Sequence, residues 1–420
     1  MAALPSIPEW IALEHDVARI LTDQEIYGWA FDEPAARELA QTLYAELNSI
    51  DQVLRNRYPY VAGPEFTPKR SNKTSGYVEG ATFTRLKDVN PSSRDHIAWI
   101  METYHGWKPD KTTASGKTAI DETVLKEIGT EEALQFFRCL ELTKQLGMLS
   151  EGKNAWLKLV RNGRLHHHCS VSTSTHRCAH RNPNLAQVPS DLEFRKLFGA
   201  SDGYVMVGAD LSGIELRMLA HYLARYDGGK YGDVLLNGDI HQVNADKIGI
   251  SRRLVKTVTY AFLYGAGDVK IGLSYDPLLS VEKAKRKGRE IRAAYVNAID
   301  GLGALLNAVK CAADRGYVRS IDGRHIAVDS PHKALNYLLQ SSAGVVAKRW
   351  MVIANDCLPY NHTQQLAFVH DELQFETLPE QAEGLRQHLE LCAGLAGEHY
   401  NLRVPIAAEG KIGSTWADVH

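Results

Sequence analysis

The chain has 420 residues, of which 44% are hydrophobic and 23% charged, a balance typical of a soluble globular protein with two or three subdomains. Its net charge of −2 excludes a generally basic surface, so any contact with nucleic acid would require basic residues gathered in one region. The six cysteines include no CxxC pair, and the sequence contains no signal peptide and no apolar run long enough to cross a membrane. A cytoplasmic protein is therefore expected.

Helices dominate the first part of the chain. Apolar residues recur at spacings of three and four in residues 9–58 and again in residues 121–149, which predicts helices in both segments. Residues 108–118 are polar and predict a loop. From about residue 156 onward, short runs typical of strands alternate with helical patterns, so strands and helices are both expected in the second part.

Residues 59–90 interrupt the helical pattern. Several glycines, prolines and basic residues occur together there, which predicts a basic loop. The sequence NPSSRDHI that follows, residues 90–97, predicts the start of another helix, with Asn90 or Ser92 as its cap.

Two carboxylates occur in the sequence VMVGADLSGIELR, residues 205–217. The pattern predicts a strand over residues 204–209, a turn, and a helix from about residue 213, with Asp210 at the carboxyl end of the strand. Ser212 and Glu215 have the S-x-x-E spacing of a capping box, and spacing alone favours this structural role for Glu215.

A second acidic site is predicted in LAFVHDELQFE, residues 366–376. Apolar residues lead to His370 and Asp371, and apolar and polar residues then alternate, which predicts a hairpin whose tight turn carries this pair. An ordinary polar turn has the same pattern. If Asp210 and Asp371 lie side by side, however, they repel unless cations lie between them, and two divalent ions held by carboxylates are the arrangement that drives phosphoryl displacement.

A basic and aromatic stripe is predicted in SRRLVKTVTYAFLYGAG, residues 251–267. Arg252, Lys256, Tyr260 and Tyr264 recur every four residues and would share one face of a helix that ends at the following glycines. Two cations and two aromatic rings on one face suit a triphosphate and a stacked base. A solvated basic edge beside two half-buried tyrosines fits the spacing about equally well.

Residues 165–180, LHHHCSVSTSTHRCAH, are rich in histidine and cysteine. Their spacings match no usual set of paired zinc ligands, and adjacent histidines point in different directions. A structural zinc site is therefore not expected.

Taken together, these segments resemble a known enzyme family. GADLSGIELRMLAHYL, the helix from Arg252 to Gly265, and VHDE resemble motifs A, B and C of family A DNA polymerases. Further segments are similar to those of the replicative polymerases of short-tailed coliphages: NPSSRDHI, PNLAQVP, LNGDIH, LYGAGDVKIG, SPHKALNYLLQSSAG and EGKIGSTWADVH. The resemblance extends from about residue 9 to residue 420 and rests on specific motif spacing.

The resemblance implies a site for two Mg²⁺ ions. Asp210 and Asp371 would hold both ions, with the carbonyl group of Leu211 as a further ligand. One ion would activate the primer 3′-hydroxyl, and the other would balance the charge of the triphosphate and of the leaving pyrophosphate. Three further residues are implied to bind the triphosphate: His241, Arg252 and Lys256.

The resemblance also assigns residues to nucleotide selection and to DNA. Glu215 would exclude a ribose 2′-hydroxyl, which is compatible with a capping role, and Tyr264 would pack at the templating position. The hydroxyl group of Tyr260 would lie toward the triphosphate and would let the enzyme accept dideoxynucleotides. Five residues are implied to contact the primer end or the minor groove of the nascent pair: Arg177, Gln187, Asn336, Gln340 and His370.

The implied fold belongs to the α+β class and has the shape of a right hand. The thumb and N-terminal helices would comprise residues 1–160, and the fingers residues 223–335. The palm would comprise residues 161–222 and 336–420 and would carry an antiparallel sheet with both aspartates.

The chain departs from the family pattern at three places. No acidic exonuclease motif precedes the segment GWAFD, residues 28–32, so no proofreading activity is expected from this chain. Residues 60–89 replace a much longer thumb insertion, which makes thioredoxin an unexpected partner. His176 stands where the family has glycine, so the DNA contact of that turn is open.

Primer–template DNA and dNTPs are the expected partners, in phage DNA replication, and a separate exonuclease or processivity factor stays open. Two alternative functions share part of the pattern: a single-subunit RNA polymerase and a catalytically silent DNA-binding subunit. Glu215 argues against the first, because a residue that excludes ribose has no use in RNA synthesis. The presence of both aspartates and of all three triphosphate-binding residues argues against the second.

Overall fold

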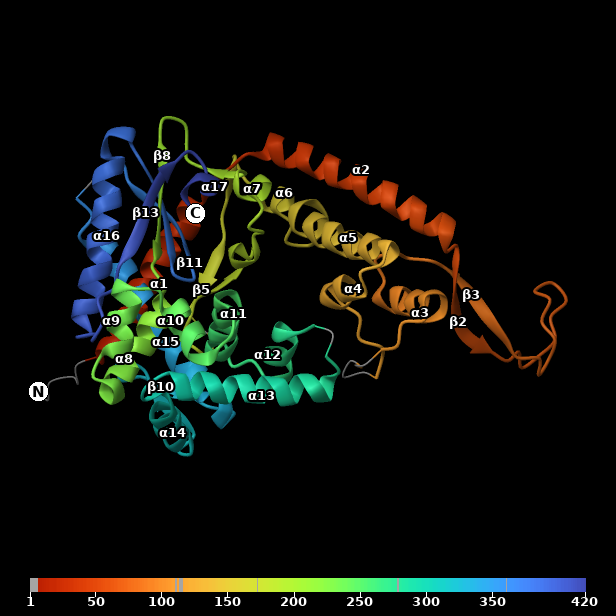
Figure 1. Ribbon diagram of the computed structural model, residues 1–420. Helices are drawn as coiled ribbons and strands as arrows, with labels where there is room; N and C mark the ends of the chain where they lie inside the picture. The colour runs from red at the N-terminus through yellow and green to blue at the C-terminus, as the bar shows by residue number, and fades with distance from the viewer. Residues whose placement is uncertain (1–6, 110–111, 113–115, 172, 278, 360) are drawn as a thin grey trace, which may run out of the picture. The chain divides into compact units, whose positions relative to one another are not determined.

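The computed structural model describes residues 7–109, 112, 116–171, 173–277, 279–359 and 361–420 (Figure 1). The chain folds into two compact units: Glu33–Lys158 forms one, and Met1–Asp32 with Leu159–His420 forms the other. Helices and antiparallel sheets are both present, which confirms the α+β class. No helix of the described residues is long and apolar enough to cross a membrane. Parts of the predicted loop at 108–118, residues 110–111 and 113–115, lie outside the described residues.

The unit Glu33–Lys158 consists mainly of helices. Two long helices, α2 (Glu33–Arg57) and α5 (Glu131–Leu146), pack against each other, and α4 (Glu122–Ile128) packs on α5. α3 (Arg94–His105) also belongs to this unit, a π-helical turn, Gly147–Glu151, follows α5, and the short α6 (Trp156–Leu159) begins at its end. The core of this unit is formed by buried side chains from these helices, among them Leu54, Ile97, Met101 and Phe136.

Residues 59–90 do not form the basic loop that was predicted. They form an antiparallel hairpin of β2 (Tyr60–Phe66) and β3 (Phe83–Asp88), anchored to the helices by the buried side chain of Val61. A register shift in β2 places a glycine and a proline inside the strand, and they hide its alternating pattern from the sequence. Three rings cluster toward the connecting loop: Phe66, Tyr77 and Phe83.

The predicted cap of α3 is also wrong. The N-cap is Ser93, and its side chain makes no capping hydrogen bond. The side chain of Asn90 instead accepts a hydrogen bond from the backbone N–H of Ser92 at 3.0 Å. This local turn uses the Asn90 side chain before the helix begins, which is the usual competition between such turns and caps.

The other unit is built around a four-stranded antiparallel sheet with the strand order β11-β12-β8-β13. The predicted strand at 204–209 and the predicted hairpin at 366–376 are both confirmed, and the first strand runs two residues further than expected. The bounds are β8 (Val205–Leu211), β11 (Gln364–Val369), β12 (Glu372–Thr377) and β13 (Ala408–Gly413).

Helices cover this sheet. α16 (Ala382–His399) packs on β8 and β13, and α15 (Ala334–Asp356) packs on α16 (Figure 1). α1 (Glu9–Tyr27) contacts α15 and β11, while α8 (Ile214–Asp227) contacts α15. Short elements complete the sheet region: β1 (Trp29–Phe31), β4 (Arg164–Leu165), β5 (His168–Ser170), β6 (Ala179–Arg181), α7 (Leu192–Arg195), β7 (Phe198–Gly199) and α17 (Trp416–Val419).

The segment between α8 and α15 is almost entirely helical. It contains α9 (Lys230–Asn237), α10 (Ile240–Ile248), α11 (Arg252–Leu263), α12 (Asp268–Tyr275), α13 (Val281–Ala298) and α14 (Leu302–Ala313), followed by the hairpin of β9 (Tyr317–Arg319) and β10 (His325–Ala327). α12 and α13 lie against each other with backbone in contact, because a Cβ atom added at Gly272 would lie 1.9 Å from the carbonyl oxygen of Ala284. A Cβ atom at Gly288 would likewise lie 1.7 Å from the carbonyl oxygen of Asp268.

The predicted boundaries of thumb, palm and fingers stay a prediction. All four strands of the large sheet come from the two segments assigned to the palm, and the segment assigned to the fingers contains α9 to α14. α1, which the thumb prediction included, packs against α15 and β11.

Candidate active site

The two predicted aspartates lie at neighbouring strand ends. In the pairing of β8 with β12, Asp210 stands opposite Glu372, and the backbone N–H of Leu211 donates a 3.1 Å hydrogen bond to the carbonyl oxygen of Asp371. The turn between β11 and β12 consists of His370 and Asp371, and His370 adopts a positive φ of 59°. Strand pairing therefore brings together two acids that are far apart in the sequence.

These carboxylates lie in an acidic environment that raises their pKa values. Although part of Asp210 is open to solvent, the protein around it raises its pKa to about 7, first through burial and then through the negative charges of Asp371 and Glu372. Burial, followed by the charge of Glu215, raises the pKa of Asp371 to about 6. No ion pair to Asp210 or Asp371 is present among the described residues, so the site favours a bound cation.

Glu215 faces this site rather than capping its own helix. Its Oε1 atom accepts hydrogen bonds from Arg177 Nη2 at 2.7 Å and from Tyr264 Oη at 3.1 Å. The predicted capping box is wrong, because the N-cap of α8 is Gly213, with a φ of 58° and no capping side chain. The left-handed turn at Gly213 displaces Ser212 from the cap position, which leaves the Glu215 carboxylate available to the site.

The predicted basic and aromatic helix is α11. The hydroxyl group of Ser251 caps it by accepting a hydrogen bond from the backbone N–H of Leu254, and Gly265, with a φ of 70°, follows its end. The rings of Tyr260 and Tyr264 stack with centroids 6.4 Å apart, and Lys256 is exposed. The predicted stripe therefore forms, and Tyr264 links it to Glu215 through the hydrogen bond described above.

α10 carries the remaining residue of the predicted triphosphate group, His241. Arg252 Nε lies 2.6 Å from the Asp239 side chain, which also caps the start of α10. His241 is buried in the first turn of α10, with its ring 6.2 Å from that of Tyr260, and burial lowers its pKa. Its Nδ1 atom has no hydrogen-bond partner among the described residues, so one polar atom of this ring is left for a ligand.

The residues predicted to contact DNA are only partly brought together. The side chain of Asn336 is buried and donates to the Leu263 carbonyl oxygen at 2.6 Å, so it holds the end of α11. Gln340 is half-buried on α15, whereas His370 and Gln187 are exposed. Among the described residues, the side chains of Gln340 and Gln187 form no hydrogen bond with another predicted site residue.

The turn around Arg177 is fixed to α15. His176, which departs from the family pattern, adopts a positive φ of 59°, and its Nδ1 atom lies 3.1 Å from the hydroxyl oxygen of Ser341. The Arg177 side chain is then directed toward Glu215, as described above. His176 therefore adopts a backbone conformation that glycine adopts more easily.

Two hydrogen bonds to Glu372, the residue after Asp371, were not predicted from the sequence, and we call them the Glu372 brace. Glu372 is buried, and its carboxylate accepts a 2.6 Å hydrogen bond from Trp416 Nε1 and lies 2.9 Å from His420 Nδ1. Alternation along β12 would have placed Glu372 toward solvent. Both partners, Trp416 and His420, lie in the segment TWADVH, residues 415–420. This segment is one of those that resemble the polymerase family, but no role was predicted for it.

The histidine- and cysteine-rich segment packs as part of the sheet region. Cys169 Sγ lies 3.7 Å from His180 Nε2, and His167 Nε2 lies 3.1 Å from the Leu366 carbonyl oxygen. Within the described ranges, no group of three or more His, Cys, Asp or Glu side chains has an arrangement that could hold a metal ion. A metal ion at the two predicted aspartates would therefore need further ligands from backbone, water or substrate.

Comparison with known proteins identifies the family of the chain. The family model described as DNA polymerase family A matches residues 69–418. The chain is 30% identical to the DNA-directed DNA polymerases of Enterobacteria phage T3 and Escherichia phage T7, over 98% of this chain and 70% of each relative. The solved POL domain of Pol1 from M. smegmatis, in complex with DNA primer-template and dNTP, is 22% identical and has the same fold, with a TM-score of 0.76 over 97% of this chain and 70% of that one. The chain therefore belongs to DNA polymerase family A.

Proposed function

We propose that this DNA-directed DNA polymerase extends the 3′ end of a primer with dNTPs, on a DNA template, by a reaction that uses two divalent metal ions. The observation that supports it most strongly is the pair of carboxylates, Asp210 and Asp371. They form no ion pair among the described residues, and Asp371 lies close to Tyr260 and Tyr264 of the α11 stripe. The similarity to phage T3 and T7 polymerases supports a role in phage DNA replication.

The donor atoms of the site fit Mg²⁺. Hard divalent cations prefer oxygen ligands, and the strand ends offer two carboxylates and the carbonyl group of Leu211. When bound, two such ions lower the pKa of the primer hydroxyl and balance the charge of the triphosphate. Asp210 and Asp371 hold their positions through the backbone pairing of β8 and β12, which the brace on Glu372 reinforces.

Arg252, Lys256 and His241 form the triphosphate side of the site. The ion pair between Arg252 and Asp239 places the guanidinium group near the start of α10, where His241 lies. An incoming triphosphate would compete with Asp239 for Arg252, and the exposed Lys256 adds a second positive charge. In this proposal the Tyr260 hydroxyl lies beside the phosphates and permits the use of dideoxynucleotides.

Glu215 and Tyr264 select the sugar and align the base. The hydrogen bonds from Arg177 and Tyr264 fix the Glu215 carboxylate, and a fixed side chain excludes a 2′-hydroxyl better than a mobile one. Arg177, Gln187, Asn336, Gln340 and His370 would contact the primer end or the minor groove. Because Arg177 and Asn336 already have protein partners, binding of DNA would have to exchange or share these hydrogen bonds.

The predicted division into thumb, palm and fingers stays part of this proposal. Primer–template DNA and dNTPs are the proposed partners. That thioredoxin is not a partner stays a prediction. The presence of a separate exonuclease or processivity factor stays open.

Primer extension tests the function directly. A labelled primer annealed to a longer DNA template is incubated with Mg²⁺ and either dNTPs or rNTPs, and a primer without template is the control. We expect template-length products with dNTPs and at most short products with rNTPs. Efficient extension with rNTPs would point to an RNA polymerase, and extension with neither substrate would point to a silent DNA-binding subunit.

A further inference from the structure

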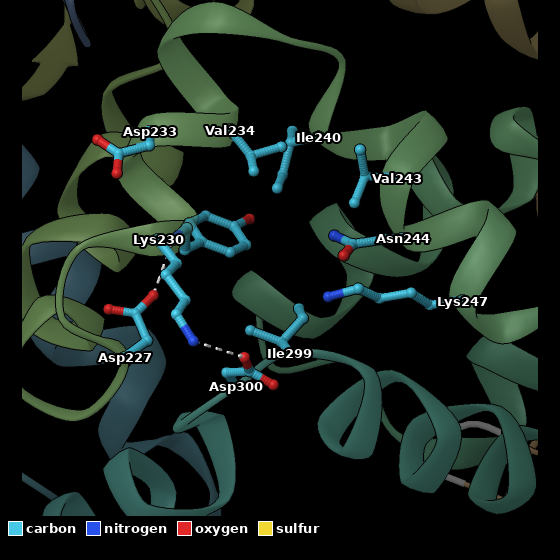
Figure 2. A pocket seen from close by; sticks show the side chains of 11 residues that line it. Asp227, Lys230, Asp233, Val234, Ile240, Val243, Asn244, Lys247, Ile299 and Asp300 are labelled. Carbon is cyan, nitrogen blue, oxygen red and sulfur yellow. Dashed lines mark hydrogen bonds and ion pairs between the residues drawn. The ribbon is translucent and has the colours of Figure 1, made fainter.

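A pocket of about 380 Å³ lies among α8, α9, α10 and the turn between α13 and α14, all in the same unit (Figure 2). Its walls are largely aliphatic, with Val234 from α9, Ile240 and Val243 from α10, and Ile299 from the turn. Pockets of this size commonly hold a small organic molecule. None of the residues that line it has a role in the function proposed above.

A buried amide without a partner lies in this pocket. Asn244 is only 2% exposed, and its Nδ2 atom has no hydrogen-bond partner among the described residues. Figure 2 shows its side chain directed into the pocket from α10, next to that of Lys247. Buried polar groups are nearly always paired, because an unpaired buried donor destabilises the folded chain. The pocket therefore presents a donor that suits an acceptor atom of a ligand.

The charged side chains of the pocket are either satisfied or exposed. Lys230 lies 3.9 Å from Asp300, and both side chains are more than half exposed. Lys247 Nζ donates to the Ala298 carbonyl oxygen at 3.1 Å. The carboxylate of the buried Asp227 accepts two backbone hydrogen bonds of 2.8 Å near the start of α9. The buried charge of this lining is therefore satisfied, and the others form a polar rim.

These features together select an uncharged ligand. Three aspartates and two lysines line the pocket, and this surplus of negative charge disfavours a phosphate group. The Asn244 amide is neutral, so a charged ligand atom beside it would lose its hydration without gaining an opposite charge. A nucleobase has apolar faces and an edge with acceptor atoms, and its sugar carries hydroxyl groups. The base therefore matches the aliphatic walls and the Asn244 donor, and the sugar matches the polar rim.

We propose that this pocket binds an uncharged nucleoside. The base lies between the aliphatic walls and accepts a hydrogen bond from Asn244 Nδ2, and the sugar hydroxyls lie near Asp300 at the rim. Helical spacing places Asn244 and Lys247 on one face of α10 and His241 outside that face. The nucleoside therefore does not occupy the proposed triphosphate side of the active site.

Isothermal titration calorimetry on the full chain, without metal ion, primer or template, tests the proposal. The probes are adenosine, AMP and the ribonucleoside of indole, which keeps the bicyclic shape of the base but has no acceptor atom on its ring. We expect saturable binding of adenosine with a Kd below about 1 mM. The indole nucleoside should bind at least about fivefold more weakly, because it leaves the buried donor unpaired. AMP should bind no more tightly than adenosine.

Asn244→Leu removes the donor and leaves a side chain of similar volume. It should weaken adenosine binding at least about fivefold and reduce the preference for adenosine over the indole nucleoside to less than about twofold. Because the donor is unpaired in the free chain, the midpoint of thermal unfolding should stay equal or rise. A clear fall in this midpoint would show that the donor already has a partner, which contradicts the proposal.

Gln242→Leu is the matched control. It removes an exposed amide of the same helix that does not line the pocket, so it should change the affinity for adenosine no more than about twofold. Equal loss of adenosine binding in this control and in Asn244→Leu would overturn the proposal.

Three further results would also overturn it. The first is the absence of saturable adenosine binding below about 1 mM, and the second is equal affinity of the unmodified chain for adenosine and the indole nucleoside. The third is binding of AMP at least about tenfold tighter than that of adenosine, which would assign the binding to a phosphate site. Because the assay contains no metal ion, primer or template, failure of this proposal leaves the proposed polymerase function untouched.

Discussion

Two groups of charged side chains in the same unit use similar residues in opposite ways. Between α1, α15 and the β9–β10 hairpin, the fully buried Lys348 lies 2.8 and 2.7 Å from the two carboxylate oxygens of Glu14, and Arg324 pairs with both Glu14 and Asp322. At the ends of β8 and β12, Asp210 and Asp371 have no such partners among the described residues. The first group joins three elements of the fold, whereas the second keeps its charge available for cations.

This contrast shows that charged side chains of the same kinds can serve either stability or function. A buried ion pair is strongly destabilising to break, because the remaining charge has no partner. A cluster of unpaired carboxylates has the opposite property, since removing one charge relieves repulsion while removing a ligand. Each of the following predictions separates the two groups by a different measurement.

The largest expected effect is on catalysis. Asp210→Asn and Asp371→Asn should each lower the rate of primer extension at least about a thousandfold, because each removes an anionic ligand that is worth several kcal/mol in the transition state. Primer–template binding should remain, and the free energy of unfolding should stay equal or rise. Extension near the wild-type rate by either variant would contradict the assignment of the metal site.

The buried network should respond in the opposite sense. Lys348→Met should lower the free energy of unfolding by about 3 kcal/mol, because it removes one of the two cations that pair with the Glu14 carboxylate, the other being Arg324. Urea denaturation measures this, and extension per folded molecule should be unchanged. Lys333→Met is the control, since it breaks an exposed pair with Asp329 and should cost less than about 1 kcal/mol. Equal losses in the two variants would show that burial of the network has no special weight.

Glu215 is intermediate, because it lies in the site but has two protein partners. Glu215→Ala should raise the use of rNTPs relative to dNTPs about ten- to hundredfold, since it removes the carboxylate that crowds the 2′-hydroxyl position. The ratio of kcat/KM for the two substrates measures this. Arg177→Lys keeps the positive charge but not the geometry and should have a smaller effect in the same direction. An unchanged ratio in Glu215→Ala would leave Glu215 with no role in sugar selection.

The smallest expected effect is a change in the free energy of unfolding with pH and with divalent cations. Because the pKa values of Asp210 and Asp371 are raised to about 7 and about 6, the folded protein retains protons that the unfolded chain has released between about pH 4 and pH 7. These two groups therefore lower the stability of the metal-free protein as the pH rises through this window. The difference between wild type and the Asp371→Asn variant should show this contribution.

A divalent cation should reverse that loss. At ten times its Kd it should stabilise the protein by about 1.4 kcal/mol at pH 8, and by less at pH 6, where protons compete for the same oxygens. Unfolding curves with chelator, Mg²⁺ or Ca²⁺ measure both effects. If Asp371→Asn kept the same cation-dependent stabilisation, the ion would be bound elsewhere.

Local patterns in the sequence predicted much of this site. The strand before Asp210, the hairpin turn at Asp371 and the helix from Arg252 follow from periodicity over a few residues, and each is present. The family resemblance predicted a family A DNA polymerase, and the match to the family model confirmed the family. The individual roles of the site residues stay proposals.

The failures have separate physical causes. The Glu372 brace depends on Trp416 and His420, which are more than forty residues away, and no local pattern records such contacts. The capping box failed because glycine allowed a left-handed turn that outweighed a favourable spacing. The hairpin β2–β3 was hidden because a glycine and a proline inside a strand read as loop signals.

The contact between α12 and α13 has a mechanical consequence. Where two helices touch through glycine, there is no layer of side chains that could change rotamer and absorb a displacement, so the pair cannot slide or separate without losing contact. α12 also packs on α11, the helix that carries Arg252 and Tyr260. A shift of α13 therefore moves α12 with it, and this close coupling depends on the absence of two methyl groups, at Gly272 and Gly288.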